Sequence, residues 1–147
     1  MLIPYTPLPL ALDSVMLSER VQGLTVVIEV PKGEIRYGKG WQHRMPADYG
    51  YIEGTMGADG DEMDCYLGPD PASNMVYVVD QSRMDDHSKF DEHKCMIGFL
   101  SLKEARAIYI KGHTHGEEIF RAITPMTMTI FKSWLKHGDI DKPVNLK

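Results

Sequence analysis

One short acidic segment carries the residue types and the spacing for chemistry on a metal ion. Asp59, Asp61 and Asp64 fall within six residues of a glycine-rich stretch. Carboxylates this dense repel one another and resist burial unless a cation neutralises them. The ligands are all oxygen, with no His or Cys between them, which favours a hard ion such as Mg²⁺, Mn²⁺ or Ca²⁺ over zinc. Gly57 and Gly60 leave the backbone free to bring the carboxylates onto one centre.

This segment has two other interpretations. A calcium EF-hand loop that starts at Asp59 fails, because Asp64 stands at the sixth position, where a Gly is needed, and Asp70 at the twelfth, where a Glu is needed. The remaining alternative is a solvated acidic turn, since Asp-Gly pairs commonly mark hairpins. The loop alone does not decide between this turn and a metal site.

The composition is that of an ordinary soluble globular chain. Its 147 residues suit one domain over 1–147, and 43% of them are hydrophobic and 25% charged. The net charge of -5 argues against general binding to nucleic acid or membrane surfaces. No apolar run reaches the roughly 20 residues of a membrane span, and the N-terminus lacks the pattern of a signal peptide. We therefore expect a cytoplasmic protein in which Cys65 and Cys95 are reduced thiols.

The pattern of apolar residues predicts short strands followed by helices. Strands are expected at 24–30, 34–37, 48–52, 63–67, 74–80, 94–100 and 118–123, with a polar loop at 81–93. Ser101 and Glu104 form a capping box for a helix that ends at Gly112, and Thr127 caps a last helix that stops at Gly138. Residues 1–12 hold three prolines and predict an extended N-terminal arm.

This order of elements predicts a mainly β (α+β) fold. The expected architecture is a small OB-like antiparallel β-barrel, closed or half-closed, of about five strands, with two helices in the C-terminal half. Glu29 lies inside the apolar strand 24–30, where a buried carboxylate needs a partner or a metal. The alternative for Glu29 is the exposed face of an edge strand, which is the commoner setting for an isolated Glu.

At these residues the sequence resembles the family I (soluble) inorganic pyrophosphatases. The matching pieces are residues 26–33 (Val-Val-Ile-Glu-Val-Pro-Lys-Gly), Arg36-Tyr37, Tyr49-Gly-Tyr-Ile52, Asp59-Gly-Asp-Glu-Met-Asp64, and the acidic segment from Asp86 to Lys94. The fourth piece has the family form Asp-Gly-Asp-x-x-Asp. Residues 90–99 and 123–126 resemble the compact version of this domain found in bacteriophage and prophage proteins.

The resemblance implies an inorganic pyrophosphatase that uses Mg²⁺, or Mn²⁺, and splits pyrophosphate into two phosphates by a metal-activated water, without a covalent intermediate. The implied metal ligands are Asp59, Asp61, Asp64, Asp86, Asp91, Glu92 and Glu29, with Glu92 and Asp91 competing for one role. The implied catalytic residues are Asp61, which orients or deprotonates the water, with Tyr49 and Lys94. The implied substrate-binding residues are Lys32, Arg36, Tyr49, Lys94, Arg44 and Lys111.

The sequence departs from the family pattern mainly at its phosphate-binding cations. The family Arg before Pro46 has no secure counterpart, which leaves Arg44 or His43 as substitutes. The family's late Tyr-Lys pair has no clean match either, which leaves Tyr109 or Lys111.

These departures keep two alternative functions open. One is a related phosphoanhydride hydrolase that acts on a nucleotide or polyphosphate. The other is a non-catalytic, metal-binding structural or partner-binding module of a phage. The proline-rich arm and the resemblance are also compatible with a homo-oligomer. His113 and His115 are expected at a solvated surface, because two His make at most half a zinc site.

Overall fold

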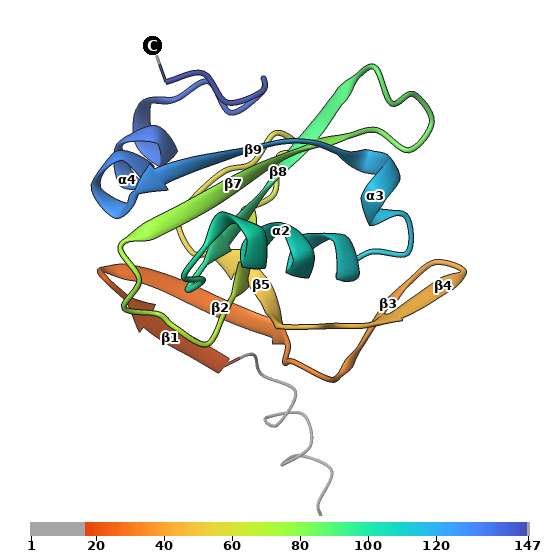
Figure 1. Cartoon of the computed structure of the whole chain (residues 1–147), viewed down its shortest axis with the longest axis horizontal. Coiled ribbons are helices and arrows are strands. Elements are labelled where there is room, and N and C mark those ends of the chain that lie inside the picture. The colour runs from red at the N-terminus through yellow and green to blue at the C-terminus, as the bar shows by residue number, and fades with distance from the viewer. Residues whose placement is uncertain (1–16, 147) are drawn as a thin grey trace, which may run out of the picture.

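The computed structural model describes residues 17–146 and is built on one strongly curled sheet (Figure 1). The sheet has seven strands in the order β1-β2-β5-β6-β8-β7-β9. These strands are β1 (Leu17–Val21), β2 (Leu24–Val30), β5 (Asp48–Ile52), β6 (Met63–Leu67), β7 (Met75–Ser82), β8 (Phe90–Ile97) and β9 (Phe120–Thr127). Neighbours are antiparallel except β6 and β8, which run parallel.

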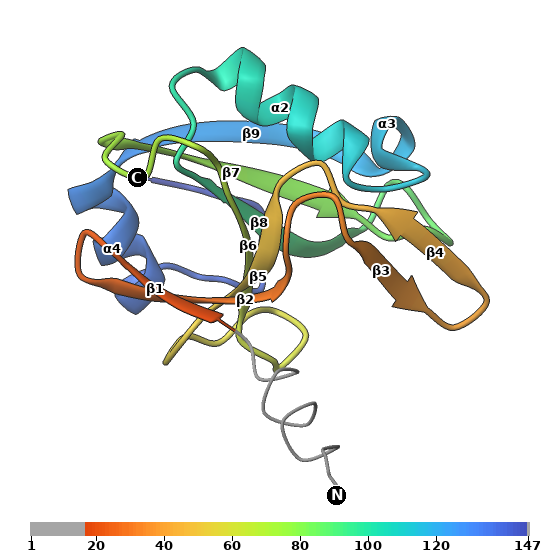
Figure 2. The ribbon, with the colours of Figure 1, turned by 90° about the horizontal axis from the view of Figure 1, so that it is seen from below.

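A two-stranded hairpin and three helices complete the described part of the chain. The hairpin is formed by β3 (Ile35–Gly38) and β4 (Trp41–Arg44), and it projects from one end of the sheet (Figure 2). The helices are α2 (Leu102–Lys111), α3 (Gly116–Ile119) and α4 (Met128–His137). None of the helices within residues 17–146 is both long and apolar enough to cross a membrane.

The two faces of the sheet pack into two separate apolar cores. Phe131 and Trp134 of α4 pack on one face with residues such as Cys65, whereas Ala105 and Tyr109 of α2 pack on the other with residues such as Tyr66. Successive strand residues point to opposite faces, so the neighbours Cys65 and Tyr66 belong to different cores. Side chains on the α2 face of β5, β6 and β8 are therefore directed toward the same region.

The predicted α+β class, the OB-like character and the two long helices of the C-terminal half are confirmed. The sheet is not closed, because β1 and β9 form its two edges in the described residues. The cysteines Cys65 and Cys95 are buried, free thiols and are register partners across β6 and β8. The expected arm at 1–12 lies outside the described residues.

The segment expected to be a polar loop at 81–93 largely belongs to strands. β7 extends to Ser82 and β8 begins at Phe90, so only the tip between them is a loop. The sequence pattern fails here because Gln81, Ser82 and His93 are polar yet almost fully buried. The strand β4 and the short helix α3 were not predicted either.

The predicted capping box opens helix α2. The Ser101 hydroxyl accepts a hydrogen bond from the Glu104 backbone N–H at 3.1 Å, and the Glu104 carboxylate accepts one from the Leu100 N–H at 3.1 Å. At the other end, the N–H of Gly112 donates to the carbonyl of Ile108. Both ends of the helix thus satisfy backbone groups that would otherwise lack partners.

We expect Ser101→Ala to lower the free energy of unfolding by about 1 kcal/mol, because the N-cap acceptor is lost. Urea denaturation measures this change. The matched control is Lys103→Ala on the exposed face of α2, for which we expect a change below about 0.5 kcal/mol. Equal effects of the two substitutions would contradict a stabilising cap.

Candidate active site

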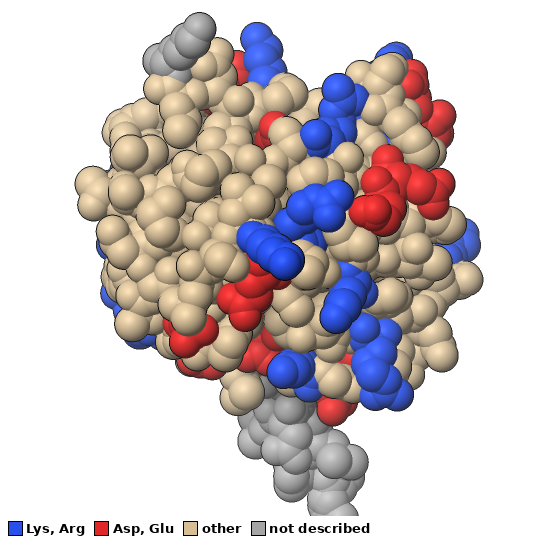
Figure 3. Space-filling model, in the orientation of Figure 1, with Lys and Arg blue, Asp and Glu red and all other residues tan. Residues whose placement is uncertain are grey.

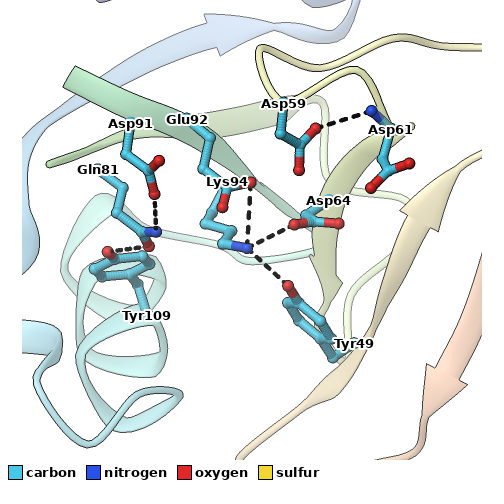
Figure 4. Close-up of polar contacts among 9 residues, drawn as sticks. All are labelled: Tyr49, Asp59, Asp61, Asp64, Gln81, Asp91, Glu92, Lys94 and Tyr109. Atoms are coloured by element: carbon cyan, nitrogen blue, oxygen red, sulfur yellow. Dashed lines mark hydrogen bonds and ion pairs between the residues drawn. The ribbon is translucent and has the colours of Figure 1, made fainter. Parts of the chain in front are cut away.

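A buried lysine lies at the centre of the polar residues on the α2 face of the sheet. Lys94 projects from β8 and only 6% of it is exposed. Its ammonium donates to the Tyr49 hydroxyl at 2.8 Å and to Asp64 Oδ2 at 2.6 Å, and lies 3.6 Å from Glu92 Oε1 (Figure 4). One cation is therefore shared by a phenol and two carboxylates that come from three neighbouring strands.

The strand registers explain why these residues meet. Tyr49 of β5 is opposite Tyr66 of β6, and Tyr66 is the register partner of Met96 on β8. Asp64 lies two residues before Tyr66, and Lys94 lies two residues before Met96. Because side chains alternate with a period of two, Asp64 and Lys94 share a face with Tyr49. Asp64 and Lys94 lie at the edge of the apolar core on this face of the sheet.

The charges around Lys94 keep it protonated. Burial alone would lower the pKa of its ammonium, but Tyr49, Asp64 and Glu92 raise it more, so the pKa lies well above its ordinary value. Burial also raises the pKa of the Tyr49 hydroxyl, which therefore stays protonated at neutral pH. Tyr49 accepts from Lys94 and keeps its own proton available for donation to a bound anion.

Glu92 is the carboxylate whose titration is most strongly displaced. Burial raises the pKa of Glu92 to about 7, with Lys94 opposing this rise and the negative charge of Asp64 adding to it. Without a further cation, Glu92 is thus partly protonated near neutral pH. A second positive charge beside Asp64 and Glu92 would favour full ionisation of this group.

Glu29 and Arg36 approach the same site from β2 and β3. A bulge between Ile28 and Val30 interrupts the β2–β5 pairing at Glu29, and such bulges redirect a side chain. Glu29 is exposed, although β2 is not an edge strand but lies between β1 and β5. Burial of the carboxyl group and the charge of Asp64 raise its pKa. The Arg36 guanidinium lies over the Tyr49 ring, with its Cζ 4.5 Å from the ring centroid.

The loop between β5 and β6 holds the other two aspartates of the acidic motif. The Asp59 carboxylate accepts a hydrogen bond from the Asp61 backbone N–H at 3.0 Å. The Gly57 N–H donates to the Asp61 carbonyl at 2.6 Å, and Gly60 has a φ of +89°, which glycine adopts most readily. Figure 4 shows the Asp59 and Asp61 side chains next to each other on this loop, above Asp64 in this view.

Asp91 is held by a chain of hydrogen bonds that sequence reasoning missed. The Tyr109 hydroxyl of α2 donates to Gln81 Oε1 at 2.7 Å, and Gln81 Nε2 donates to Asp91 Oδ2 at 3.3 Å (Figure 4). Tyr109, considered above as a phosphate ligand, thus contacts Gln81 instead. The only signal for Gln81 was its place two residues after Val79, where the apolar run of β7 ends.

Four other residues of the expected site lie away from Lys94. Asp86 lies at the tip of the β7–β8 hairpin and accepts hydrogen bonds from the Ser88 backbone and hydroxyl. Arg44 donates to the Gly33 carbonyl, Lys32 lines a separate hollow beside Asp48, and Lys111 is exposed at the end of α2. No polar contact joins these four side chains to the Lys94 cluster within residues 17–146.

The donor chemistry around Lys94 fits a hard divalent cation. The acidic groups next to Lys94 are carboxylates, which are the ligands that Mg²⁺ prefers. Within the described residues, no three His, Cys, Asp or Glu side chains converge closely enough to hold a metal ion as they stand. The loop that carries Asp59 and Asp61 is exposed, so these two carboxylates can move without disturbing the core.

A family model described as Inorganic Pyrophosphatase matches residues 16–136, and no curated protein matches by sequence. Solved pyrophosphatases give structural matches with low identity. The one from Helicobacter pylori is 18% identical with a TM-score of 0.46, over 84% of this chain and 94% of that chain. The one from Neisseria gonorrhoeae is 18% identical with a TM-score of 0.44, over 88% and 91%.

The family model covers most of the chain, including every residue around Lys94. Its match defines the protein as a hydrolase of phosphoanhydride bonds. The chain belongs to the inorganic pyrophosphatase family.

The electrostatics of the site predict how the Glu92 carboxyl responds to its neighbours. In metal-free protein, Asp64→Asn is expected to lower the pKa of Glu92 below its value of about 7, because a negative charge is removed. Lys94→Met is expected to raise it, because a positive charge is removed. NMR titration of the Glu92 carboxyl carbon measures both shifts. Asp141→Asn, in the C-terminal segment, is the control, and shifts of the opposite sign would contradict the described geometry.

Proposed function

We propose that the chain hydrolyses inorganic pyrophosphate to two phosphates with Mg²⁺ as cofactor and without a covalent intermediate. The observation that carries this proposal is the buried Lys94 ammonium between Tyr49 and Asp64. A protonated amine in a site of low polarity attracts phosphate oxygens far more strongly than one in water. Inorganic pyrophosphatases are generally metal-dependent, and the carboxylates beside Lys94 suit such an ion.

Three groups of the chain suit the binding of the phosphate oxygens. Lys94 offers its ammonium and Tyr49 its free hydroxyl proton. Arg36 offers a guanidinium that stacks on Tyr49 and can donate two parallel hydrogen bonds to a phosphate. Together they would fix the orientation of the substrate and offset part of its negative charge.

Asp61 is the proposed acceptor of the proton from the attacking water. The oxygen of that water adds to one phosphorus, the bond from this phosphorus to the bridging oxygen breaks, and the second phosphate leaves. The side chain of Asp61 is exposed and pairs with no cation among residues 17–146, so it is available to accept a proton. Its backbone N–H is the group that anchors Asp59.

Asp59, Asp61, Asp64, Glu92 and Glu29 are the residues proposed to hold Mg²⁺. When bound, the ion neutralises pyrophosphate charge and makes a water more acidic. Asp91 is proposed as a more distant acidic residue, because Gln81 restrains its carboxylate. Asp86 is left out of this set, since it caps a turn at the hairpin tip.

The distribution of charge on the surface supports an anionic substrate. The net charge of the chain is -5, yet Figure 3 shows a band of Lys and Arg side chains that runs over α2 towards β3. Exposed basic residues of α2 include Lys103, Arg106 and Lys111. A local positive region of this kind raises the rate at which a small anion reaches the site.

Phosphate release from pyrophosphate, with and without Mg²⁺, is the first test. We expect release only with the metal, and a loss of about 100-fold or more in Asp61→Asn, because a general base of this kind contributes about that much. The matched control is Asp141→Asn, a second exposed aspartate, with an unchanged rate. Absence of release by the wild type in both Mg²⁺ and Mn²⁺ would refute the proposal.

Removal of the buried cation is the second test. Lys94→Met is expected to lower kcat/KM for pyrophosphate on the order of 100-fold, as the loss of one preorganised donor does. Because the substitution leaves Asp64 and Glu92 without their cation, circular dichroism must show that the variant is folded. Tyr49→Phe, which retains the packing, should lower the rate less. Full activity in folded Lys94→Met would place the chemistry elsewhere.

A further inference from the structure

A cavity of about 250 Å³ lies next to the site but is not used by it. Its walls are formed by Trp41 and His43 of the β3–β4 hairpin, Met84 of the β7–β8 tip, and His113, Thr114 and His115 of the turn after α2. In Figures 1 and 2 this hairpin lies beside α3 and the turn that precedes it. The cavity is of a size that suits a small aromatic ring rather than a larger ligand.

Arg36 connects this cavity to the Lys94 cluster. Its guanidinium Cζ is 5.3 Å from the Trp41 ring centroid and 4.5 Å from the Tyr49 centroid, and Lys94 Nζ is 5.3 Å from the same Tyr49 centroid. Arg36 makes no ion pair or hydrogen bond with another residue of 17–146. A charged donor without an anion thus stands between an aromatic cavity and a phosphate site.

The histidines of the cavity do not form a metal site. His43 is engaged at both ring nitrogens, by the Lys111 carbonyl at 2.5 Å and by the Thr114 hydroxyl at 3.4 Å. His115 Nδ1 is paired with Glu118 at 2.7 Å, and His113 Nδ1 accepts from the His115 backbone N–H at 2.9 Å. The three histidines therefore line the cavity with their ring faces, and their nitrogens do not converge on one point.

The cavity is also free of formal charge. Its walls contain no Lys, Arg, Asp or Glu among the described residues. Burial, with the nearby His115 and Arg36, lowers the pKa of His113, which is therefore neutral at pH 7. An uncharged, flat, polarisable group fits these walls, whereas a further phosphate would find no cation there.

From this arrangement we propose that the cavity binds the base of a nucleoside triphosphate, with Arg36 at the α-phosphate and the β–γ anhydride at Lys94. The inference rests on the proposed function, because it uses the same reacting site. Stacking on Trp41 would hold the base. The free nitrogen of His113 would be available to its polar edge, and so would the Thr114 oxygen as an acceptor, because the Thr114 proton is directed at His43. A chain of inorganic phosphates of the same length would leave the cavity unfilled.

The reaction is the same hydrolysis on a longer substrate. The oxygen of water adds to the γ-phosphorus, and the bond from that phosphorus to the oxygen bridging it to the β-phosphorus breaks. The products are a nucleoside diphosphate and phosphate, and the proton of the water passes to Asp61 and then to solvent. No oxidant or other reactant is needed.

The experiment compares three substrates, pyrophosphate, tripolyphosphate and ATP, in wild type, Trp41→Ala and Trp41→Phe with Mg²⁺. We expect the wild type to cleave ATP with a higher kcat/KM than tripolyphosphate, since both offer the same phosphates and only ATP has a base. Trp41→Ala should lower kcat/KM for ATP by about 5- to 150-fold, the range for loss of one stacking partner. Trp41→Phe should restore most of this loss, and pyrophosphate cleavage should stay within about twofold in both variants.

The outcomes separate this inference from the proposed function. Cleavage of pyrophosphate with no cleavage of ATP, or with equal use of ATP and tripolyphosphate, would overturn the inference alone. An ATPase activity that Trp41→Ala leaves unchanged, or AMP as the first product, would also overturn it. Cleavage of ATP that depends on Trp41, without cleavage of pyrophosphate, would sustain the inference and refute the proposed function.

Discussion

The architecture of the site depends on the burial of one ammonium group between two carboxylates. Lys94 is almost fully enclosed, and a charge in such surroundings is tolerated only with close partners of opposite sign. Asp64, 2.6 Å from the Lys94 ammonium, and Glu92, 3.6 Å from it, are these partners. The Tyr49 hydroxyl accepts a further hydrogen bond from the ammonium. Removing one partner of a buried pair generally costs about 3–5 kcal/mol, so these residues constrain one another strongly.

This constraint leaves the site with an excess of negative charge. Lys94 carries one positive charge against the carboxylates of Asp64 and Glu92. Asp59 lies near them in Figure 4, and the Glu29 carboxyl is close enough to feel the charge of Asp64. Burial raises the pKa of Glu92, and the negative charge of Asp64 adds to this rise. A site in this condition gains stability from any added cation.

Much of the fold follows from local features of the sequence, and the exceptions have physical reasons. The β-branched run of β2, the capping box of α2 and the Thr127 cap of α4 predicted their elements correctly. The start of β8 was missed because His93, although polar, is buried against Phe90 and Trp134. No local sequence pattern predicts the burial of a polar side chain when the residues that cover it are distant in the sequence.

The candidate site was predictable to a similar extent. Tyr49, Asp64, Glu92 and Lys94 were expected from the motifs, and they meet in the structure. The link from Tyr109 through Gln81 to Asp91 was not predicted, because it joins a helix and two strands with no motif among them. The stacking of Arg36 between Tyr49 and Trp41 likewise depends on the tertiary position of the hairpin.

The parallel pairing of β6 and β8 has a consequence for the order in which the protein folds. Lys94 reaches Asp64 across 30 residues and Tyr49 across 45, whereas β5 and β6 are joined by a short loop. Closure of such long loops is slow, and parallel strands cannot pair through a tight turn. The β5–β6 unit can therefore form before β8 docks, and Asp64 gains the Lys94 ammonium only when β8 is in place. A partly folded chain without β8 thus exposes an acidic surface that lacks its buried ammonium.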